Sequence, residues 1–431
     1  MPLLKVAFAL VVATLLLVRP AFAAQTPVPV VVPVVVPVVG PVVGPVAASA
    51  SPGEESYRLG ELERSIDAAF ETGDFVGLGV AVVRNGETRF LKTWGLLEAG
   101  GAEKVTPETV FRIASLSKGV AASLAGVAMT EGLLAPDDAA LPYAPGLALA
   151  GGAEHALTLG HLLSHQTGLP PNAYDNLLEA DVPVDEILPK YKGVKLICPV
   201  GKCYSYQNIA FDIVGRALSS VYELPYEALA EERLFAPLGM TTASVGEEGL
   251  ARHGNWARPH VRDRLARGSE KYGPWRATRV KPAYYRTPAA GGVNASLLDM
   301  TLWLKAQMGG APGVLSPAAL ALIHAPRVIS PAESARIRSV SPRFKAAQYG
   351  FGWRLYNYGG APVVSHSGTV DGYAAQIAFL PEQEVGIVLL SNSRSRRIWR
   401  ILPTFLDLEL GLPREDWLEI EDSAAPVAGG G

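Results

Sequence analysis

The stretch Phe111-Arg112-Ile113-Ala114-Ser115-Leu116-Ser117-Lys118 leads directly into an apolar run from Gly119 to Leu134. A helix that is apolar almost all round is typical of a domain interior, so a polar Ser115 and Lys118 at its start need a function. Residues three apart share one face of a helix. A Lys in a poorly hydrated place loses part of its preference for the proton and can help the Ser hydroxyl to attack a carbonyl. Alone, this Ser-x-x-Lys is weak evidence, because the same spacing also arises by chance in helices with a capping Ser and a solvated Lys.

Residues 1–23 have the features of a secretory signal peptide. Lys5 precedes an apolar run from Val6 to Val18, and Ala21-Phe22-Ala23 forms a cleavage site of the A-x-A type. The run is short for a membrane span, so an uncleaved anchor is the less favoured alternative. We therefore predict a periplasmic or secreted protein, with no transmembrane span in the mature chain.

Residues 24–52 form a low-complexity tract dominated by Val and Pro. Recurring Pro excludes both a helix and a central strand, so the tract is predicted to be an extended, polyproline-like tether. Its Val content leaves a contact with the cell wall or a membrane open. The folded domain is predicted over residues 53–412, followed by a C-terminal tail at 413–431.

The charge balance argues against a nucleic-acid partner. The 431 residues include 38 Lys and Arg against 41 Asp and Glu, a formal net charge of −3. No basic excess and no long run of like charge is present, so neither nucleic-acid binding nor a charged interaction tail is predicted.

The chain has two cysteines, Cys198 and Cys203, which are close in sequence. In an exported protein such a pair can form a disulfide across a tight loop, and two separate thiols are the alternative. Two cysteines are too few for a structural zinc site.

The ends of the folded part are predicted to form strands, and its middle helices. Asn85-Gly86 between two strand-like runs predicts a hairpin over Val76 to Trp94. Residues 124–289 alternate helical patterns with loops rich in Pro and Gly. The other expected elements are a helix over Tyr57 to Glu71, strands over Tyr349 to Tyr356, Ala361 to His366, Gly372 to Leu380 and Val385 to Ser391, and a closing helix over Arg394 to Leu410 that Pro403 interrupts.

We therefore predict an α+β fold with two lobes. An antiparallel sheet flanked by helices is expected from residues 55–123 and 290–412, with a mostly helical lobe of residues 124–289 inserted between them. The helix that begins near Ser115 would lie where the lobes meet, and ligand clefts favour such junctions.

Two further clusters carry polar residues that suit a reaction centre. Tyr206 and Asn208 bracket a turn-like segment, and a Tyr near cationic groups can act as a base. His366 and Gly368 follow a strand, where a Gly permits close backbone approach to a ligand. Taken singly, each cluster is better explained as a structural loop or a strand end.

The order Ser-x-x-Lys, Tyr-x-Asn and His-x-Gly resembles the penicillin-recognising serine enzymes. The closest resemblance is to the class C β-lactamase-like group, which includes DD-peptidases, D-aminopeptidases and family VIII-type esterases. It extends from about Leu59 to Leu410, and its fold has an α/β lobe with a helical insertion. Further stretches that look like this family are Gly160 to Pro170, Leu234 to Met240 and Pro288 to Ser296.

The resemblance implies a role for each motif residue. Ser115 would be the nucleophile that forms an acyl-enzyme, Lys118 its proton partner and Tyr206 the general base. The backbone N–H groups of Ser115 and Thr369 would form the oxyanion hole. Substrate contacts are implied for Asn208, His366, Gly368 and Thr369, and Asn172 is a further candidate.

One residue departs from the family pattern. Class C β-lactamases usually carry Lys-Thr-Gly where this chain has His366-Ser367-Gly368. A His removes a permanently positive anchor for the β-lactam carboxylate, so efficient β-lactamase activity is not expected to follow from the motif alone. Acylation by β-lactams remains an expectation.

Neither a cofactor nor a metal is predicted. His161 and His165 are four apart, but the Glu of H-E-x-x-H is missing, so we interpret them as packing residues near the cleft. No G-x-S-x-G elbow and no phosphate-binding loop spacing occurs.

Three hypotheses follow for the function. The first is an exported serine hydrolase acting on a small molecule or short peptide, namely a β-lactam or a D-amino-acid peptide or amide. The second is a carboxylesterase on the same scaffold, motivated by His366. The third is a penicillin-binding or wall-binding protein that is acylated and then turns over little.

Overall fold

The computed structural model describes residues 51–267 and 271–420, which belong to one compact unit. The predicted signal peptide and nearly all of the predicted tether lie outside the described residues. Pro52, at the end of that tract, is already the first residue of helix α1 (Pro52–Glu71). Within the described ranges, no helix combines the length and the apolar character needed to cross a bilayer.

The central feature is an antiparallel sheet of eight strands in the order β2-β1-β13-β12-β11-β10-β9-β8. It joins both ends of the folded part, because β1 pairs with β13 in a register that places Leu78 opposite Ser391. The predicted α+β fold with an antiparallel sheet and flanking helices is confirmed. The strands are β1 (Gly77–Arg84), β2 (Glu87–Gly95), β8 (Val328–Ile329), β9 (Phe344–Tyr349), β10 (Arg354–Tyr358), β11 (Ala361–Val370), β12 (Tyr373–Leu380) and β13 (Val385–Ser391).

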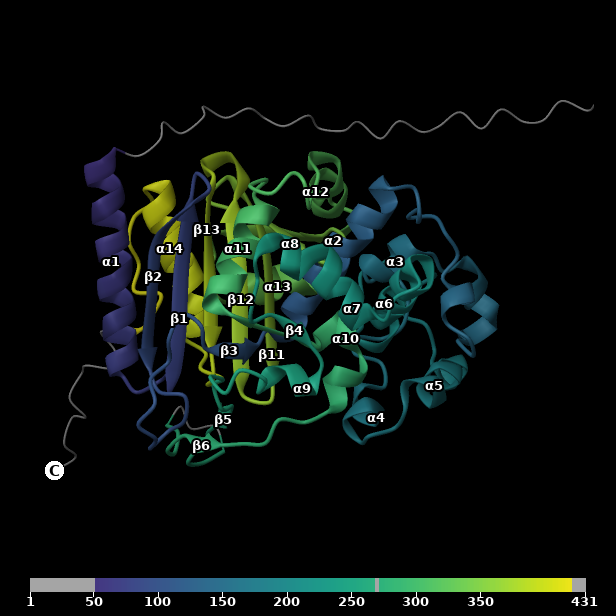
Figure 1. The fold of residues 1–431 in the computed structure, drawn as a ribbon, viewed down its shortest axis with the longest axis horizontal. Helices are drawn as coiled ribbons and strands as arrows, with labels where there is room; N and C mark the ends of the chain where they lie inside the picture. The colour runs from purple at the N-terminus through teal and green to yellow at the C-terminus, as the bar shows by residue number, and fades with distance from the viewer. Residues whose placement is uncertain (1–50, 268–270, 421–431) are drawn as a thin grey trace, which may run out of the picture. The chain divides into compact units, whose positions relative to one another are not determined.

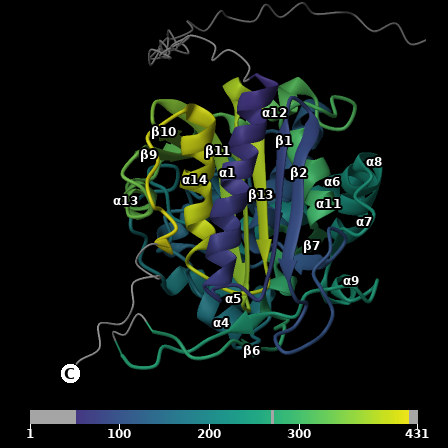
Figure 2. The same cartoon turned by 90° about the vertical axis from the view of Figure 1, so that its left-hand side faces the viewer.

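Helices cover both faces of the sheet. Figure 2 shows α1 and α14 (Ile398–Leu410) side by side across one face. Successive side chains of β1 point to opposite faces of the sheet, and each face has its own apolar core. Val80 and Val82 pack with these terminal helices, while Ala81 and Val83 pack on the opposite side. The two buried layers hold the sheet between them.

The opposite face carries the helical part of the chain (Figure 1). Its central helix is α2 (Ser117–Thr130), which is buried along nearly its whole length and packs against α6, α10 and α12. A second, small sheet has the strand order β3-β7-β4, and its strand β3 precedes α2 in the chain. The remaining elements are β3 (Val110–Arg112), α3 (Leu159–Leu163), α4 (Asp175–Glu179), α5 (Val184–Ile187), α6 (Ile209–Tyr222), α7 (Tyr226–Ala230), α8 (Ala236–Leu238), β4 (Ser244–Val245), α9 (Glu247–Leu250), β5 (His260–Val261), β6 (Arg276–Ala277), α10 (Pro288–Gly291), β7 (Val293–Ser296), α11 (Leu297–Gln307), α12 (Pro317–His324) and α13 (Pro331–Arg338).

The late strands differ from the prediction in two places. The run from Tyr349 to Tyr356 is not one strand, because the chain turns between β9 and β10 at Gly352, whose φ of 71° favours glycine. Strand β11 continues through Gly368 to Val370, where a turn was expected after His366. The actual turn follows at Asp371, where the backbone is left-handed.

The expected interruption of the closing helix at Pro403 is also wrong. Helix α14 passes through Pro403 without a break, although a Pro inside a helix costs about 3 kcal/mol. Ile401, Leu402, Phe405 and Leu406 are buried against the sheet on either side of it. Burial of these apolar side chains offsets the lost hydrogen bond.

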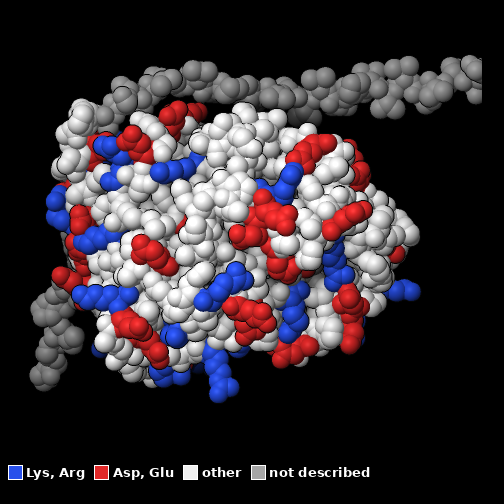
Figure 3. Space-filling model, in the orientation of Figure 1, with Lys and Arg blue, Asp and Glu red and all other residues white. Residues whose placement is uncertain are grey.

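Charged side chains are distributed without a dominant sign. On the face shown in Figure 3, Lys and Arg are interspersed with Asp and Glu. That pattern agrees with the small net charge of −3.

The sulfur atoms of Cys198 and Cys203 are bonded in the structure, and the disulfide closes part of the loop that leads to Tyr206. For so short a loop, the reduced entropy of the unfolded chain stabilises the fold by about 2 kcal/mol.

We therefore expect reduction of the disulfide, or the double variant Cys198→Ser/Cys203→Ser, to lower Tm by about 2–3 °C. Calorimetry with and without reductant checks this prediction. An unchanged Tm on reduction would contradict it. The double variant is the control, because reductant should not change its Tm.

Candidate active site

Ser115 stands at the junction between the small sheet and the helical part. Strand β3 ends at Arg112, a 3₁₀ turn spans Ala114–Leu116, and α2 begins at Ser117. The Ser117 hydroxyl donates to the Ala114 carbonyl at 2.7 Å and accepts from the Val293 N–H at 3.0 Å. Ala114 has a φ of 51°, a strained conformation for a residue with a side chain. These contacts hold the Ser115 side chain toward a cleft of about 530 Å³.

Lys118 is wholly buried one turn into α2. Its ammonium lies 3.5 Å from the Ser115 hydroxyl and donates to Asn208 Oδ1 at 2.7 Å and to the Ala290 carbonyl at 2.8 Å. Burial lowers the pKa of Lys118, although the nearby Tyr206 and Asp175 oppose that effect. Within the described residues Lys118 forms no ion pair, so it is well suited to exchange a proton with its neighbours.

Tyr206 and Asn208 lie in the loop that enters α6. The Lys118 ammonium sits 4.7 Å from the centre of the Tyr206 ring, and the buried Tyr206 hydroxyl has no hydrogen-bond partner among the described residues. Asn172, at the exposed mouth of the cleft, donates its N–H to the Tyr206 carbonyl at 2.8 Å. The structure thus brings the predicted Ser, Lys, Tyr and Asn residues to one place.

Asp175 was missed by the sequence analysis. It lines the cleft, and Asn208 Nδ2 donates to its carboxylate at 2.6 Å. Because Asn208 Oδ1 faces Lys118, this bond orients the amide. Burial raises the pKa of Asp175, while Asn208 and Lys118 act in the opposite direction. No short motif indicates this residue; it precedes α6 by more than thirty positions and comes close only through the fold.

Strand β11 brings Gly368 and Thr369 beside Ser115. A Cβ atom added at Gly368 would lie 2.5 Å from the Ser115 nitrogen, so only Gly allows this approach. The Ser367 carbonyl accepts from Arg354 on the side of β11 that faces β10. Residues two apart in a strand point the same way, so the Thr369 N–H faces the same side. Strand β10 does not extend that far, because its first residue, Arg354, pairs with Ser365. Two backbone donors there suit an oxyanion.

A buried ion pair links these two donor segments. Arg112, at the end of β3, donates from Nη1 to the Asp371 carboxylate at 2.7 Å. Arg112 is fully buried and its guanidinium stacks 3.9 Å from the centre of the Tyr285 ring. Asp371 forms the turn after β11, so the pair connects the strand before Ser115 to the turn after Thr369.

His366 lies behind the cleft wall. It has no exposed surface, its Nε2 is 3.0 Å from the Tyr349 hydroxyl, and both its ring nitrogens are 3.3 Å from Arg354 Nη1. Burial lowers the pKa of His366 well below its usual value, and Arg354 and Lys118 lower it further. This position differs from the predicted substrate contact, because a side chain without exposed surface supports the wall instead.

His161 and His165, the pair four residues apart in the sequence, have structural contacts. His161 closes a capping box at the start of α3 with Thr158. His165 is fully buried, with its ring centre 4.3 Å from that of Tyr206 and its Nε2 3.2 Å from the Tyr349 hydroxyl. No group of three potential metal ligands occurs among residues 51–267 and 271–420.

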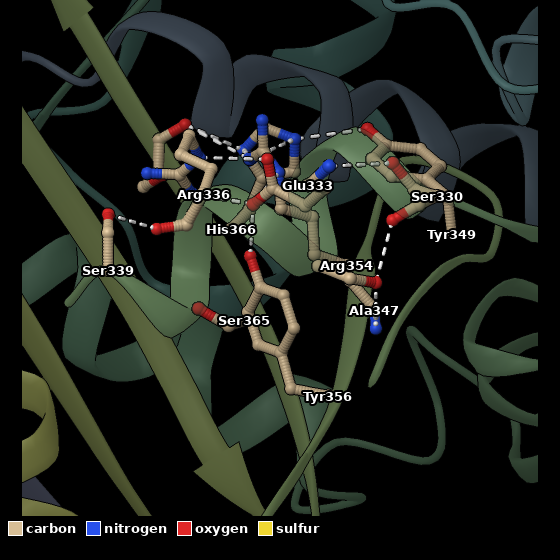
Figure 4. Close-up of polar contacts among 12 residues, drawn as sticks. Ser330, Glu333, Arg336, Ser339, Ala347, Tyr349, Arg354, Tyr356, Ser365 and His366 are labelled. Atoms are coloured by element: carbon tan, nitrogen blue, oxygen red, sulfur yellow. Dashed lines mark hydrogen bonds and ion pairs between the residues drawn. The ribbon is translucent and has the colours of Figure 1, made fainter. Parts of the chain in front are cut away.

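A cationic cluster on the other wall was also missed. Arg354, the first residue of β10, forms an ion pair with Glu333 at 3.2 Å. Arg336 donates hydrogen bonds from two nitrogens to the same carboxylate. Both arginines line the cleft, and Figure 4 shows the contacts that join the cluster to His366 and Tyr349. The one available signal in the sequence was a charged residue at 354 between Trp353 and Leu355, inside a strand-like run.

The Glu333 carboxylate gives a pH dependence. Its burial raises the pKa, but Arg354, Arg336 and the Tyr356 hydroxyl outweigh that effect and hold the pKa at about 2. A lowered pKa stabilises the fold above the pKa of the unfolded chain, and this stability is lost as the pH falls toward the folded value. We expect the part of the unfolding free energy that Glu333 contributes, about 3 kcal/mol, to disappear between pH 5 and pH 2.

Urea unfolding of the wild type and of Glu333→Gln across this range checks that expectation. The difference between them should shrink as the pH falls. The exposed Glu382→Gln is a matched control that should follow the wild type. Parallel pH profiles for the wild type and Glu333→Gln would contradict the prediction.

A comparison with known protein families identifies the family of this chain. The family model described as Beta-lactamase matches residues 62–407. The chain belongs to the beta-lactamase family. This is a superfamily of serine hydrolases that also contains penicillin-binding proteins.

Individual relatives of this beta-lactamase-family chain are distant. It is 23% identical to a beta-lactamase of Pseudomonas fluorescens, over 77% of this chain and 92% of the relative. It is 25% identical to penicillin-binding protein 4 of Amycolatopsis lactamdurans, over 73% and 80%. It is 23% identical to the unguisins hydrolase of Aspergillus violaceofuscus, over 85% of this chain and 68% of that longer protein.

The octameric penicillin-binding protein homologue from Pyrococcus abyssi shares the fold. The TM-score is 0.71 at 24% identity, with 84% of this chain and 79% of the other covered.

Proposed function

We propose that this beta-lactamase-family chain is an exported serine hydrolase of the class C β-lactamase-like group. It acts through an acyl-enzyme on Ser115, and its substrates are β-lactams or peptides and amides of D-amino acids. The predicted signal peptide supports export to the periplasm or the outside of the cell, and the Val/Pro tract would allow contact with the cell wall.

The observation that carries the proposal is the position of Lys118. A fully buried ammonium without an ion-pair partner in the described residues is costly, yet this one lies 3.5 Å from the Ser115 hydroxyl at the base of a cleft. Perturbed, buried titratable groups of this kind concentrate at reaction centres.

The proposed reaction has two halves. The Ser115 oxygen bonds to the substrate carbonyl carbon, and its proton passes to the Lys118–Tyr206 pair. The Ser115 and Thr369 N–H groups stabilise the oxyanion. The bond to the leaving group then breaks and the leaving group takes the proton. Water attacks the acyl ester in the same way, and its proton returns the Ser115 oxygen to the hydroxyl form as the acid product departs.

The test follows intact mass and absorbance after mixing the mature protein with a chromogenic cephalosporin. An adduct that forms and clears with a colour change, and is absent from Ser115→Ala, would support turnover of a β-lactam. A persistent adduct would favour a penicillin-binding role with little turnover. If no substrate in a panel of β-lactams, D-amino-acid amides and short esters depends on Ser115, the proposal fails.

A carboxylesterase is the second candidate. His366 stands where class C β-lactamases usually carry a Lys, and here it is buried and its pKa is lowered well below the usual value. Relative kcat/KM values for short acyl esters and for penam and cephem rings separate the candidates. Esters that are turned over more slowly than every ring substrate would exclude the esterase.

A further inference from the structure

Tyr349 carries a buried hydroxyl that the proposed reaction does not use. It is the last residue of β9, and its side chain has no exposed surface. His165 follows α3, and its Nε2 is 3.2 Å from the hydroxyl oxygen. His366 belongs to β11, and its Nε2 is 3.0 Å from the same oxygen (Figure 4). Two imidazole nitrogens therefore share one hydroxyl, which has a single proton to donate.

The other ring nitrogen of His165 fixes the direction of its bond to Tyr349. The backbone N–H of Gln207 donates to His165 Nδ1 at 3.2 Å. A backbone N–H can only donate, so Nδ1 accepts and carries no proton. The proton of the neutral ring is then on Nε2, and His165 donates it to the Tyr349 oxygen.

The other ring nitrogen of His366 fixes the same direction from the opposite end. His366 Nδ1 is 3.0 Å from the Ser367 carbonyl oxygen, which can only accept. Nδ1 therefore carries the proton of the neutral ring, and Nε2 is left as an acceptor. The Tyr349 hydroxyl accepts from His165 and donates to this nitrogen. Two independent bonds, one at each end, thus require the same orientation of the hydroxyl.

Both imidazoles must be neutral for this chain of hydrogen bonds to exist. A protonated His165 would turn a second donor toward a backbone N–H, and a protonated His366 would leave the Tyr349 proton without an acceptor. Burial lowers the pKa of both rings well below the usual value, and Lys118 and Arg354 lower it further. The buried position and the two neighbouring cations keep both rings neutral near pH 7.

The chain of hydrogen bonds connects two halves of the candidate site. Its first donor belongs to Gln207, the residue between Tyr206 and Asn208. Its last acceptor is the carbonyl of Ser367, the residue before Gly368. One segment supplies the proposed base, and the other makes the close approach to the nucleophile. A buried network in which every member is satisfied makes a site rigid, so this one fixes the two segments relative to each other.

We propose that the Tyr349 hydroxyl is a positioning group for acyl transfer to Ser115. It joins His165 and His366 into one directed chain, which holds the loop of the proposed base against the strand of the oxyanion donors. An imidazole can accept at one nitrogen and donate at the other, whereas the Lys that class C β-lactamases usually carry at this position can only donate. The inference rests on the proposed function, because the positioning acts on that acyl transfer.

The direction of the chain is tested by long-range ¹H–¹⁵N spectra of the full protein, labelled at histidine, at pH 7. Contacts with the Tyr349 ring protons assign the two signals among those of the seven histidines. In the wild type His165 should be the Nε2–H tautomer and His366 the Nδ1–H tautomer. The opposite tautomer or a charged ring at either position would overturn the inference, whether or not a variant folds.

The positioning role is tested with Tyr349→Phe, which removes the hydroxyl and keeps the ring. The substrate is 4-nitrophenyl butyrate or, if that ester is not turned over, the panel member with the highest Ser115-dependent rate. We expect kcat to fall by about 10- to 100-fold while KM stays within about 3-fold, because the binding contacts remain and only the geometry of the transfer changes.

Tyr358→Phe is the matched control. The Tyr358 hydroxyl is equally buried and donates to Asp407 at 2.6 Å, but it lies in the core on the α14 face of the sheet. This variant loses a comparable hydrogen bond, and its kcat should equal that of the wild type.

The remaining outcomes overturn the inference. An unchanged kcat in a folded Tyr349→Phe would do so, and so would an equal loss in both tyrosine variants, since that would reflect a general loosening of the fold. A Ser115-dependent rate that does not need the Tyr349 hydroxyl leaves the proposed function intact. If no substrate depends on Ser115, the proposed function fails and the positioning role with it.

Discussion

Replacing Lys118 by Met is expected to lower kcat/KM for acylation by about 10³-fold or more. Met has a similar length but cannot exchange a proton, and it leaves the Asn208 and Ala290 oxygens without their donor. Stopped-flow measurement of acylation by a chromogenic cephalosporin or a good ester reporter gives the rate. The exposed Lys345→Met is a matched control and should behave as the wild type.

A second variant separates charge from proton exchange at this position. Lys118→Arg keeps a positive charge but holds its proton at every accessible pH. We expect it to be nearly as slow as Lys118→Met. Acylation at the wild-type rate in Lys118→Arg would mean that only the charge matters, and the assignment of Lys118 as a proton partner would then be withdrawn.

The second large effect is expected for Gly368→Ala. The new Cβ would stand 2.5 Å from the Ser115 nitrogen and 2.9 Å from Ala114 Cβ, so the Ser115 N–H must move away from the position that the oxyanion needs. Loss of one oxyanion-hole donor lowers kcat by about 10²- to 10³-fold. Because KM reflects binding before the oxyanion forms, kcat should fall more than KM rises.

The control for this variant is Gly313→Ala, where an added Cβ meets no atom within 4 Å and the backbone is not left-handed. Both variants should give cooperative melting curves. An unchanged kcat in a folded Gly368→Ala would show that the oxyanion does not form between Ser115 and Thr369.

The fold was predictable where local patterns decide it. Asn85-Gly86 fixes the first hairpin, and both residues adopt the positive φ that such a turn requires. The strand boundaries after Tyr349 were wrong because strand-like residues continue through the turn at Gly352, and only the pairing of β9 with β10 shows where the chain reverses. Periodicity alone does not reveal such a reversal.

Some residues of the candidate site were predictable from short motifs, and others were not. Ser115 and Lys118 share one helical turn, and Tyr206 and Asn208 one loop, so their spacing could be recognised in the sequence. Arg354 joins the site through the register that places it opposite Ser365, and Glu333 joins it from α13. Such residues depend on how distant strands and helices pack, which short motifs do not specify.

The ion pair between Arg112 and Asp371 has a consequence for the order of biosynthesis. Its two residues are 259 positions apart, so a ribosome has made most of the protein before the second one emerges. Long-range contacts of this kind form late, because the intervening chain must first be ordered. The Ser115 turn therefore acquires its second backbone donor only in the last stage of maturation, and a nascent or truncated polypeptide that lacks β11 is expected to carry its nucleophile in an inert form.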